Sequence, residues 1–223
     1  MALAVPVQAG YVPPANADAP TSRTTGGGRR GGCQGVGDID LVALAPQFHI
    51  GQTLSTHPTL VWYAPADIHQ PLDIELYQKN ARGRWERLKT FTLEEKPAGF
   101  MSFSWPETES ALTVGQTYRW QVVSTCVIGL PARDLVTTAE LEVVAPPADL
   151  KDVEASDPVA QAQQYAEQGL WYDALATVAS SPASAEQAYR DELLLNLADL
   201  EDASADNTET YLGRQLRRIV ALP

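Results

Sequence analysis

Between residues 38 and 147, large apolar side chains recur at every second position in short runs. The clearest runs are Leu72–Tyr77, Met101–Trp105 and Thr138–Val143, and glycine and proline residues lie between them. Because successive side chains of a strand point to opposite faces of a sheet, a period of two predicts strands with one buried face. Six or seven such strands in about 110 residues predict a mainly β fold, an immunoglobulin-like or fibronectin-III-like antiparallel β-sandwich.

The stretch ALTVGQTYRWQVVSTC adds a more specific signal to this pattern. Its residues Leu112, Gly115 and Tyr118 have the spacing Leu-x-x-Gly-x-x-Tyr, which resembles the tyrosine corner of such sandwiches. Trp120 and Cys126 follow on the same predicted strand face as Tyr118. Antibody domains place a cysteine two residues after this tyrosine, whereas Cys126 comes eight residues later. The usual disulfide between the two sheets is therefore not implied.

The chain has two cysteines, Cys33 and Cys126. In an exported protein we expect them to form a disulfide that ties the start of the sandwich to the strand carrying Cys126. Closing a loop of this length stabilises the fold by about 4–5 kcal/mol in the chain-entropy model. Two free cysteines are the alternative. No nearby histidine in the sequence supplies a base, so a catalytic cysteine is not expected.

Helical signals replace the alternation after Pro146-Pro147. Asp157-Pro158 is an N-cap and first-turn pair, and Gly169 ends the helix that this pair begins. Trp171 and Ala174 start a second apolar spacing of helical type. The junction around these residues resembles that of a tetratricopeptide hairpin, although the sequence shows one such unit and no repeat.

Two further helical segments complete this region. Ser184–Gln187 has the form of a capping box ahead of apolar residues with helical spacing, and Leu212–Ile219 is amphipathic. The sequence therefore divides into a disordered segment at residues 1–37, a sandwich at 38–147 and a small helical extension at 155–221.

The first 37 residues are rich in alanine, proline and glycine, a composition that buries little apolar surface. Val7-Gln8-Ala9 and Ala15-Asn16-Ala17 each resemble the small-x-small end of a secretory signal, although no basic start precedes them. The remnant of an export signal and a disordered tail both fit this segment. Export would place the protein in the periplasm or outside the cell.

The formal net charge is -12, with 16 basic and 28 acidic residues. The acidic excess lies in residues 148–223, which carry 5 basic and 14 acidic groups. Phosphate neutralisation needs clustered lysine and arginine, so we do not expect a nucleic-acid partner. No apolar run reaches the roughly 18 residues of a membrane-spanning helix. The acidic helices are expected to keep the protein soluble or to present a partner surface.

The three histidines, His49, His57 and His69, occur in one window with Asp67 and Asp73. Zinc favours such side chains, but the histidines lack the close spacing of a ligand pair. We therefore expect no metal site. The sequence also lacks a nucleophile elbow, a P-loop and a dinucleotide fingerprint, so no cofactor and no catalytic residue is assigned.

Two further functions start from residue type alone. A glycosidase-type hydrolase would use paired carboxylates, and the candidates are Glu94, Glu95, Glu107 and Glu109. Paired acids beside strands, however, usually lie in solvated turns. Aromatic faces suit sugar stacking, and a carbohydrate-binding platform would use four residues: Trp62, Tyr63, Trp85 and Trp105. Core packing is the alternative for these four side chains.

Three segments, in this order, resemble the largely cyanobacterial family catalogued as domain of unknown function 928. They are GQTLSTHPTLVWY at 51–63, LTVGQTYRW at 112–120 and GLWYDALAT at 169–177. The positions of Cys33 and Cys126 also fit the pattern of the family. The resemblance covers about residues 29–180, and the region 127–139 departs from it. It implies a signal peptide, and hence export, and it implies no catalytic residues.

Export, the predicted fold class and the absence of catalytic motifs together favour a non-catalytic interaction or assembly module of the cell envelope. The expected partner is another envelope protein. Carbohydrate binding, with a glycan as the ligand, is the first alternative, and a hydrolase is the second.

Overall fold

The computed structural model describes residues 10–21, 39–65, 70–94, 98–126, 134–148, 150 and 157–222. The strands are β1 (Val42–Ala43), β2 (Gly51–Thr53), β3 (Thr59–Ala64), β4 (Leu72–Lys79), β5 (Trp85–Leu93), β6 (Gly99–Ser104), β7 (Thr117–Ser124) and β8 (Leu135–Val143). The helices are α1 (Pro158–Glu167), α2 (Trp171–Val178), α3 (Ser184–Ser204) and α4 (Tyr211–Val220). Two sheets, mostly antiparallel, are followed by helices, which confirms this part of the predicted fold. Because helices and strands hold similar shares of the described residues, the fold is mixed and not mainly β as predicted.

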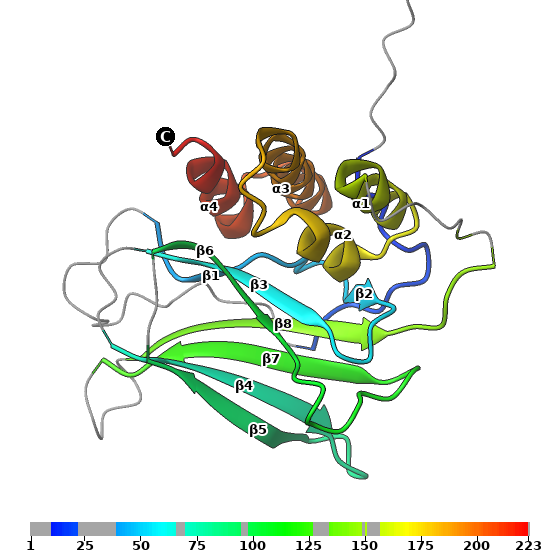
Figure 1. Ribbon diagram of the computed structural model, residues 1–223, viewed down its shortest axis with the longest axis vertical. Coiled ribbons are helices and arrows are strands. Elements are labelled where there is room, and N and C mark those ends of the chain that lie inside the picture. Colours follow the sequence, from blue (N-terminus) through cyan, green and yellow to red (C-terminus); the bar gives the residue numbers. More distant parts are fainter. Residues whose placement is uncertain are drawn as a thin grey trace, which may run out of the picture.

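The strands form two sheets. The smaller sheet has the order β1-β3-β6 and the larger sheet the order β2-β8-β7-β4-β5. Neighbouring strands are antiparallel except β2 and β8, which are parallel. Figure 1 shows three layers, in which the smaller sheet lies between the larger sheet and the helices.

This order of layers explains where the sequence alternates and where it does not. In the larger sheet, β4 and β7 bury every second residue, as the period of two predicts. In the smaller sheet, five of the six residues of β3 are buried, because one face of this sheet meets the larger sheet and the other meets the helices. A strand buried on both faces has a continuous apolar sequence, and TLVWYA is such a run.

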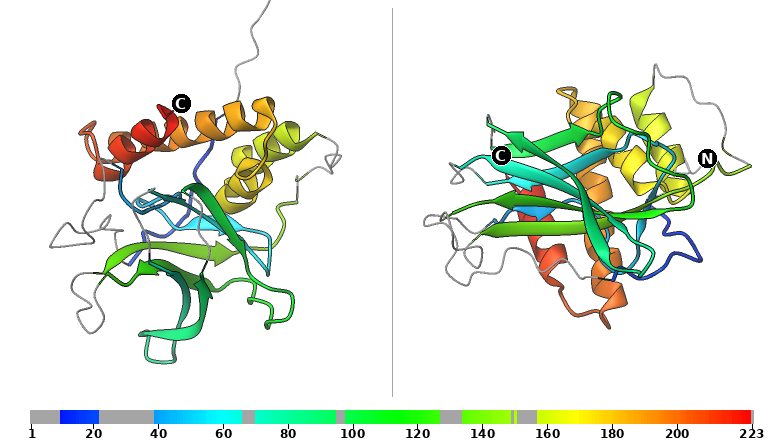
Figure 2. Two further views of the ribbon diagram at one scale, coloured as in Figure 1. Left: turned by 60° about the vertical axis from the view of Figure 1, so that its left-hand side comes forward. Right: turned by 90° about the horizontal axis from the view of Figure 1, so that it is seen from below.

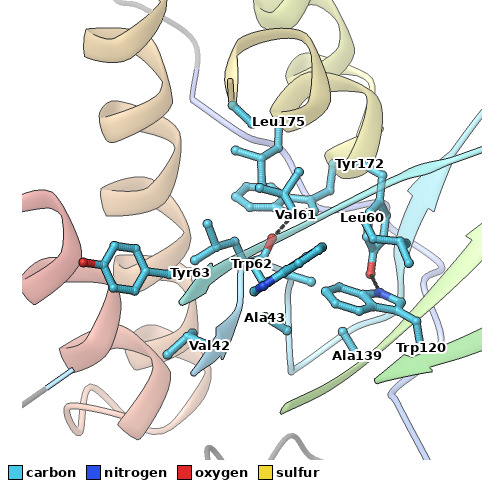
Figure 3. Packing of buried hydrophobic residues seen from close by; sticks show 14 of the residues in the cluster. Val42, Ala43, Leu60, Val61, Trp62, Tyr63, Trp120, Ala139, Tyr172 and Leu175 are labelled. Atoms are coloured by element: carbon cyan, nitrogen blue, oxygen red, sulfur yellow. Dashed lines mark hydrogen bonds between the residues drawn. The ribbon is translucent and has the colours of Figure 1, made fainter. Parts of the chain in front are cut away.

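The helices share one core with the sheets. Trp171 is fully buried and donates its indole N–H to the carbonyl of Leu44 at 2.9 Å. The hydroxyl of Tyr172 accepts a hydrogen bond from the Trp120 indole at 2.9 Å (Figure 3). The same hydroxyl donates a hydrogen bond to the Glu140 carbonyl at 3.0 Å. The buried apolar residues of the strands and the helices form a single cluster. The helical region is therefore a third layer of the same core.

The helix ends follow the sequence signals at two places and depart from them at a third. The Asp157 side chain caps α1 by accepting from the Ala160 amide at 3.0 Å. Gly169, between α1 and α2, has φ +78°, a left-handed conformation that favours glycine. At α3 the N-cap is Ala183, without a side-chain hydrogen bond, so the capping box predicted to begin at Ser184 is wrong. No helix in the described part of the chain is both long enough and apolar enough to span a membrane.

Residues 10–21 contact the folded core at several points, although the sequence predicts disorder throughout 1–37. Tyr11 is 3% exposed, and its ring meets that of Trp171 edge-on with 4.9 Å between centroids. Its hydroxyl is hydrogen-bonded to Nε2 of His49 at 2.7 Å. One aromatic side chain thus anchors a stretch whose composition gives no sign of burial.

Candidate functional site

The β4–β5 hairpin concentrates positive charge in an acidic protein. Its residues 79–89, KNARGRWERLK, hold five basic residues and one acidic residue, and we call this segment the basic arm. The arm therefore contains five of the 16 lysine and arginine residues of the chain. All five are exposed: Lys79, Arg82, Arg84, Arg87 and Lys89. The hairpin turn lies at the end of the molecule opposite the helices (Figure 1; Figure 2, left).

The turn of the arm is fixed by local hydrogen bonds. The Asn80 side chain accepts from the amides of Arg82 and Arg84, at 3.0 and 3.1 Å. Gly83 has φ +72°, which a glycine adopts without strain. Because both contacts use arginine backbone atoms, the two guanidinium groups are left available at the turn.

The strand β5 is an edge of the larger sheet. It contains a β-bulge, because Leu76 pairs with Lys89 while Tyr77 pairs with Arg87. Leu88 lies between these two partners and is 39% exposed. The arm therefore presents an apolar side chain between two cations.

The charge of the arm is partly neutralised at its base and not at its turn. Two cations have carboxylate partners: Arg87 pairs with Glu75, and Lys89 pairs with Glu109. For Arg82 and Arg84 the described residues provide no ion-pair partner. The free positive charge is therefore greatest at the turn.

A second candidate is a polar cavity of about 280 Å³, which we call the junction pocket. It lies between strands β2 and β3 on one side and helices α1 and α2 on the other. It is lined by Thr53, Ser55, His57, Thr59, Gln161, Tyr165, Tyr172, Asp173, Ala176 and Thr177. The Asp173 carboxylate accepts from the Leu54 amide at 3.0 Å and from the Thr53 hydroxyl at 3.2 Å. Burial raises the pKa of Asp173 to about 6, against the lowering effect of these hydrogen bonds. Such a lining suits a small polar ligand.

The residues of the predicted tyrosine corner lie together. The Tyr118 hydroxyl accepts a hydrogen bond from the Thr113 amide at 3.0 Å, which is the hydrogen bond that defines such a corner. Leu112 and Trp120 are buried, and Gly115 has φ +80°. These residues build the fold and leave no group free for chemistry.

The junction residues of the predicted helical hairpin are also structural. Trp171 and Ala174 are fully buried. A Cβ atom on Gly169 would lie 2.8 Å from Cγ of Pro14, so this glycine allows the N-terminal segment to approach. The three residues therefore hold residues 10–21 and the helices together.

The histidines do not converge in the described part of the chain. His49 is bonded to Tyr11, and its burial lowers its pKa to about 4, whereas His57 lines the junction pocket. His69 and Asp67 lie outside the described residues. Among the residues that are described, no three potential ligands are grouped as a metal site requires.

The predicted cysteine pair is only half described. The sulfur of Cys126 is half-buried and lies 3.6 Å from the carbonyl oxygen of Ser124. Cys33 lies outside the described residues. The disulfide between the two cysteines stays a prediction.

The carboxylates considered for a hydrolase are dispersed. Glu107 is exposed and lies 4.0 Å from His57, while Glu109 is paired with Lys89 at 2.8 Å. Glu95 lies outside the described residues, and Glu94 is exposed.

Core packing accounts for three of the four aromatic residues considered for sugar binding, namely Trp62, Tyr63 and Trp105. Trp85 is half-buried in the basic arm, where the Arg119 guanidinium lies 4.3 Å from its ring centroid. The four side chains therefore do not form an exposed platform.

A model of the family described as Domain of Unknown Function (DUF928) matches residues 25–208. The chain belongs to the DUF928 family. No curated protein matches it. Among solved structures, Astrotactin-2, a conserved vertebrate-specific and perforin-like membrane protein involved in neuronal development, aligns with 75% of this chain. The alignment covers 34% of that chain at 11% identity and a TM-score of 0.32, too weak a likeness for an argument about fold or function.

The basic arm of this DUF928 protein is absent from the sequence-based predictions. Residues 41–147 as a whole carry 8 basic and 11 acidic residues, so a charge count over this whole region does not reveal the basic cluster at 79–89. A charge count in a window of about ten residues would have found it. Its exposure and its distance from the helices follow from the tertiary structure.

Proposed function

We propose that this DUF928 protein is a non-catalytic interaction or assembly module of the cell envelope. The basic arm is its docking element, and the partner is an envelope protein with an acidic surface. The observation that carries the proposal is an exposed hairpin with five cations on a chain of net charge -12. A patch of one sign steers a partner of opposite sign and fixes its orientation. Nucleic acid is not the proposed partner, because the acidic remainder of the chain repels phosphate.

We also propose a specific fold class for this module: an immunoglobulin-like or fibronectin-III-like sandwich with a tetratricopeptide-like hairpin. The strand order supports it, because β1 and β2, adjacent in the chain, join different sheets and β2 pairs in parallel with the last strand. The hydrogen bond between Tyr118 and Thr113 is a second support. Sandwiches of this class are frequent among cell-surface domains.

Export to the periplasm or the cell exterior is supported by the small-x-small segment at residues 7–9. Cleavage at the second such segment, residues 15–17, would remove Tyr11, which is buried against Trp171. A disulfide between Cys33 and Cys126 would persist in either compartment. Fractionation of native cells tests this part of the proposal. We expect the protein in the periplasmic or extracellular fraction, and recovery in the cytosol alone would refute it.

Crosslinking and affinity capture from native envelopes tests the docking element. A tagged full-length chain is compared with the double variant Arg82→Glu/Arg84→Glu, which reverses the charge of the turn and keeps the backbone hydrogen bonds to Asn80. We expect a reproducible protein partner with the wild type and roughly tenfold less of it with the variant, because steering and rim ion pairs are both lost.

The matched control is Arg214→Glu/Arg218→Glu on α4, which changes the net charge by the same amount on exposed residues of the helical layer. This control is expected to retain the partner. The proposal fails if no partner is reproducibly captured, or if both double variants lose it to the same extent.

Carbohydrate binding is the second candidate, and we propose the junction pocket as its site. The hydroxyl, amide and carboxylate groups of the lining suit a hydroxylated ligand, and Tyr165 offers a half-buried aromatic ring. Retention on a glycan array should fall when Tyr165 is replaced by alanine. Equal retention by Tyr165→Ala and the wild type would exclude this site.

A further inference from the structure

We infer that the acidic surface that receives the basic arm is the helical layer of a second copy of this chain, so that copies join head to tail. This inference rests on the proposed function, because it uses the same docking element. It names the partner class: another molecule of the same protein.

The helical layer carries the charge opposite to that of the arm. Residues 157–222 contain 11 acidic and four basic residues. On α3, Glu192, Leu195 and Asp199 follow one another at spacings of three and four residues, which places them on one helix face. We call these three residues the acidic stripe. The side chain of Asp199 is 74% exposed.

The charge of the acidic stripe is not fully neutralised within the chain. Arg217 lies 2.7 Å from Asp199 and 2.8 Å from Asp202, so one cation is divided between two carboxylates. No ion pair of Glu192 is seen among the described residues. The stripe therefore retains negative charge for an external cation.

Each of the two surfaces combines its charge with one exposed leucine. Leu88 lies between Arg87 and Lys89 in the arm, and Leu195 lies between the two acids of the stripe. Both leucines are 39% exposed, whereas nearly all other leucines of the described chain are buried or half-buried. An apolar contact surrounded by ion pairs is the usual layout of a protein interface, with an apolar centre and a polar rim.

The two surfaces lie at opposite ends of the molecule, so they cannot meet within one chain (Figure 1; Figure 2, left). The part of the arm that belongs to β5, residues 85–89, spans about 13 Å at 3.3 Å per residue. The 21 residues of α3 span about 31 Å at 1.5 Å per residue, so the arm can lie along this helix. Because the contact joins two different surfaces, it either repeats from copy to copy, which gives rings or filaments, or occurs twice in a two-fold dimer.

Sedimentation velocity on the full-length chain provides the first test. At about 50 mM salt we expect species heavier than the 24.1 kDa monomer, and at about 500 mM salt we expect the monomer, because salt screens exposed ion pairs. A monomer under both conditions, at protein concentrations up to the millimolar range, would overturn the inference.

A pair of charge-reversal variants provides the sharper test. Arg82→Glu/Arg84→Glu makes the arm acidic, and Glu192→Lys/Asp199→Lys makes the stripe basic. Each variant alone then has two surfaces of the same sign and should remain monomeric. An equal mixture has complementary surfaces again and should associate, which a misfolded variant would not do. Failure of the mixture to associate would overturn the inference.

The two proposals can fail separately. If the chain is monomeric throughout but envelope capture finds a different protein that depends on Arg82 and Arg84, self-association is wrong and the docking function stands. If the mixed variants associate and capture finds no different protein, head-to-tail assembly stands and the separate envelope partner is wrong.

Discussion

Replacing Tyr172 by phenylalanine removes a single oxygen atom where α2 meets the larger sheet. That hydroxyl accepts from the Trp120 indole at 2.9 Å and donates to the Glu140 carbonyl at 3.0 Å, and Tyr172 is only 2% exposed. Without it, one buried N–H and one buried C=O lose a partner, and each unpaired group costs about 1–3 kcal/mol. A carbonyl tolerates the loss better than an N–H, so we expect Tyr172→Phe to lower the free energy of unfolding by about 2–4 kcal/mol.

Urea unfolding followed by two probes measures this effect. Far-UV circular dichroism reports mainly the helices, and tryptophan fluorescence reports the shared core around Trp120 and Trp171. Because the helices and sheets share one core, both probes should shift to lower urea together in the variant. In a thermal scan the same loss corresponds to a fall of about 4–16 °C.

Tyr165→Phe on α1 is the matched control, since it deletes the same atom from a half-buried side chain. Its effect should remain below about 1 kcal/mol. Two results would refute the reasoning. The first is an equal loss in both variants, and the second is a Tyr172→Phe protein whose helices unfold in a separate, earlier transition.

Three further predictions concern buried charge, a glycine and the cysteines. Burial raises the pKa of Glu201 from 4.5 in the unfolded chain to about 7 in the folded protein. The free energy of unfolding is therefore highest below pH 4.5, where Glu201 is protonated in both states, and it falls as the pH rises through 7 and the buried carboxyl ionises. Glu201→Gln should therefore gain about 2–3 kcal/mol over the wild type between pH 5 and pH 8 in urea unfolding, and a constant difference would contradict this. Gly169 and Gly83 both have positive φ, but of the two only a Cβ on Gly169 would meet other atoms within 4 Å. Gly83→Ala should lower the free energy of unfolding by about 1 kcal/mol, and Gly169→Ala should lower it by about 1–3 kcal/mol more. Equal losses in the two variants would argue against packing of the N-terminal segment on Gly169. In protein isolated from native cells, Cys33 and Cys126 should resist alkylation until a reductant is added, and prompt labelling of both would exclude the disulfide.

Much of the local structure could be read from short stretches of sequence. The period of two in β4, the positive φ of Gly169 and the Asp157 cap each depend on a few neighbouring residues. The tyrosine corner is also local, because Tyr118 bonds to a backbone amide only five residues earlier. The basic arm belongs to this group, since its charge density is a property of eleven consecutive positions.

Contacts between residues far apart in the chain could not be predicted from the sequence. Nothing near Tyr11 shows that it will be buried against Trp171, 160 positions later. The capping box predicted from Ser184 fits the residue pattern, yet α3 begins there without a side-chain cap. For the candidate site, the sequence holds both the basic arm and the acidic stripe, but their positions at opposite ends depend on how the layers stack (Figure 1).

The amino-acid sequence by itself determined the alternating strands, the cap of α1 and the glycine that ends this helix, because backbone preference and side-chain period act over a few residues. Only the tertiary structure decided that the smaller sheet is covered on both faces and that the helices complete its core. Burial on the second face requires the whole chain to collapse around one apolar cluster, and this condition leaves no periodic mark on the segment that becomes β3. The same collapse sends the positive hairpin and the negative helices to opposite ends of the molecule, where each can meet a partner.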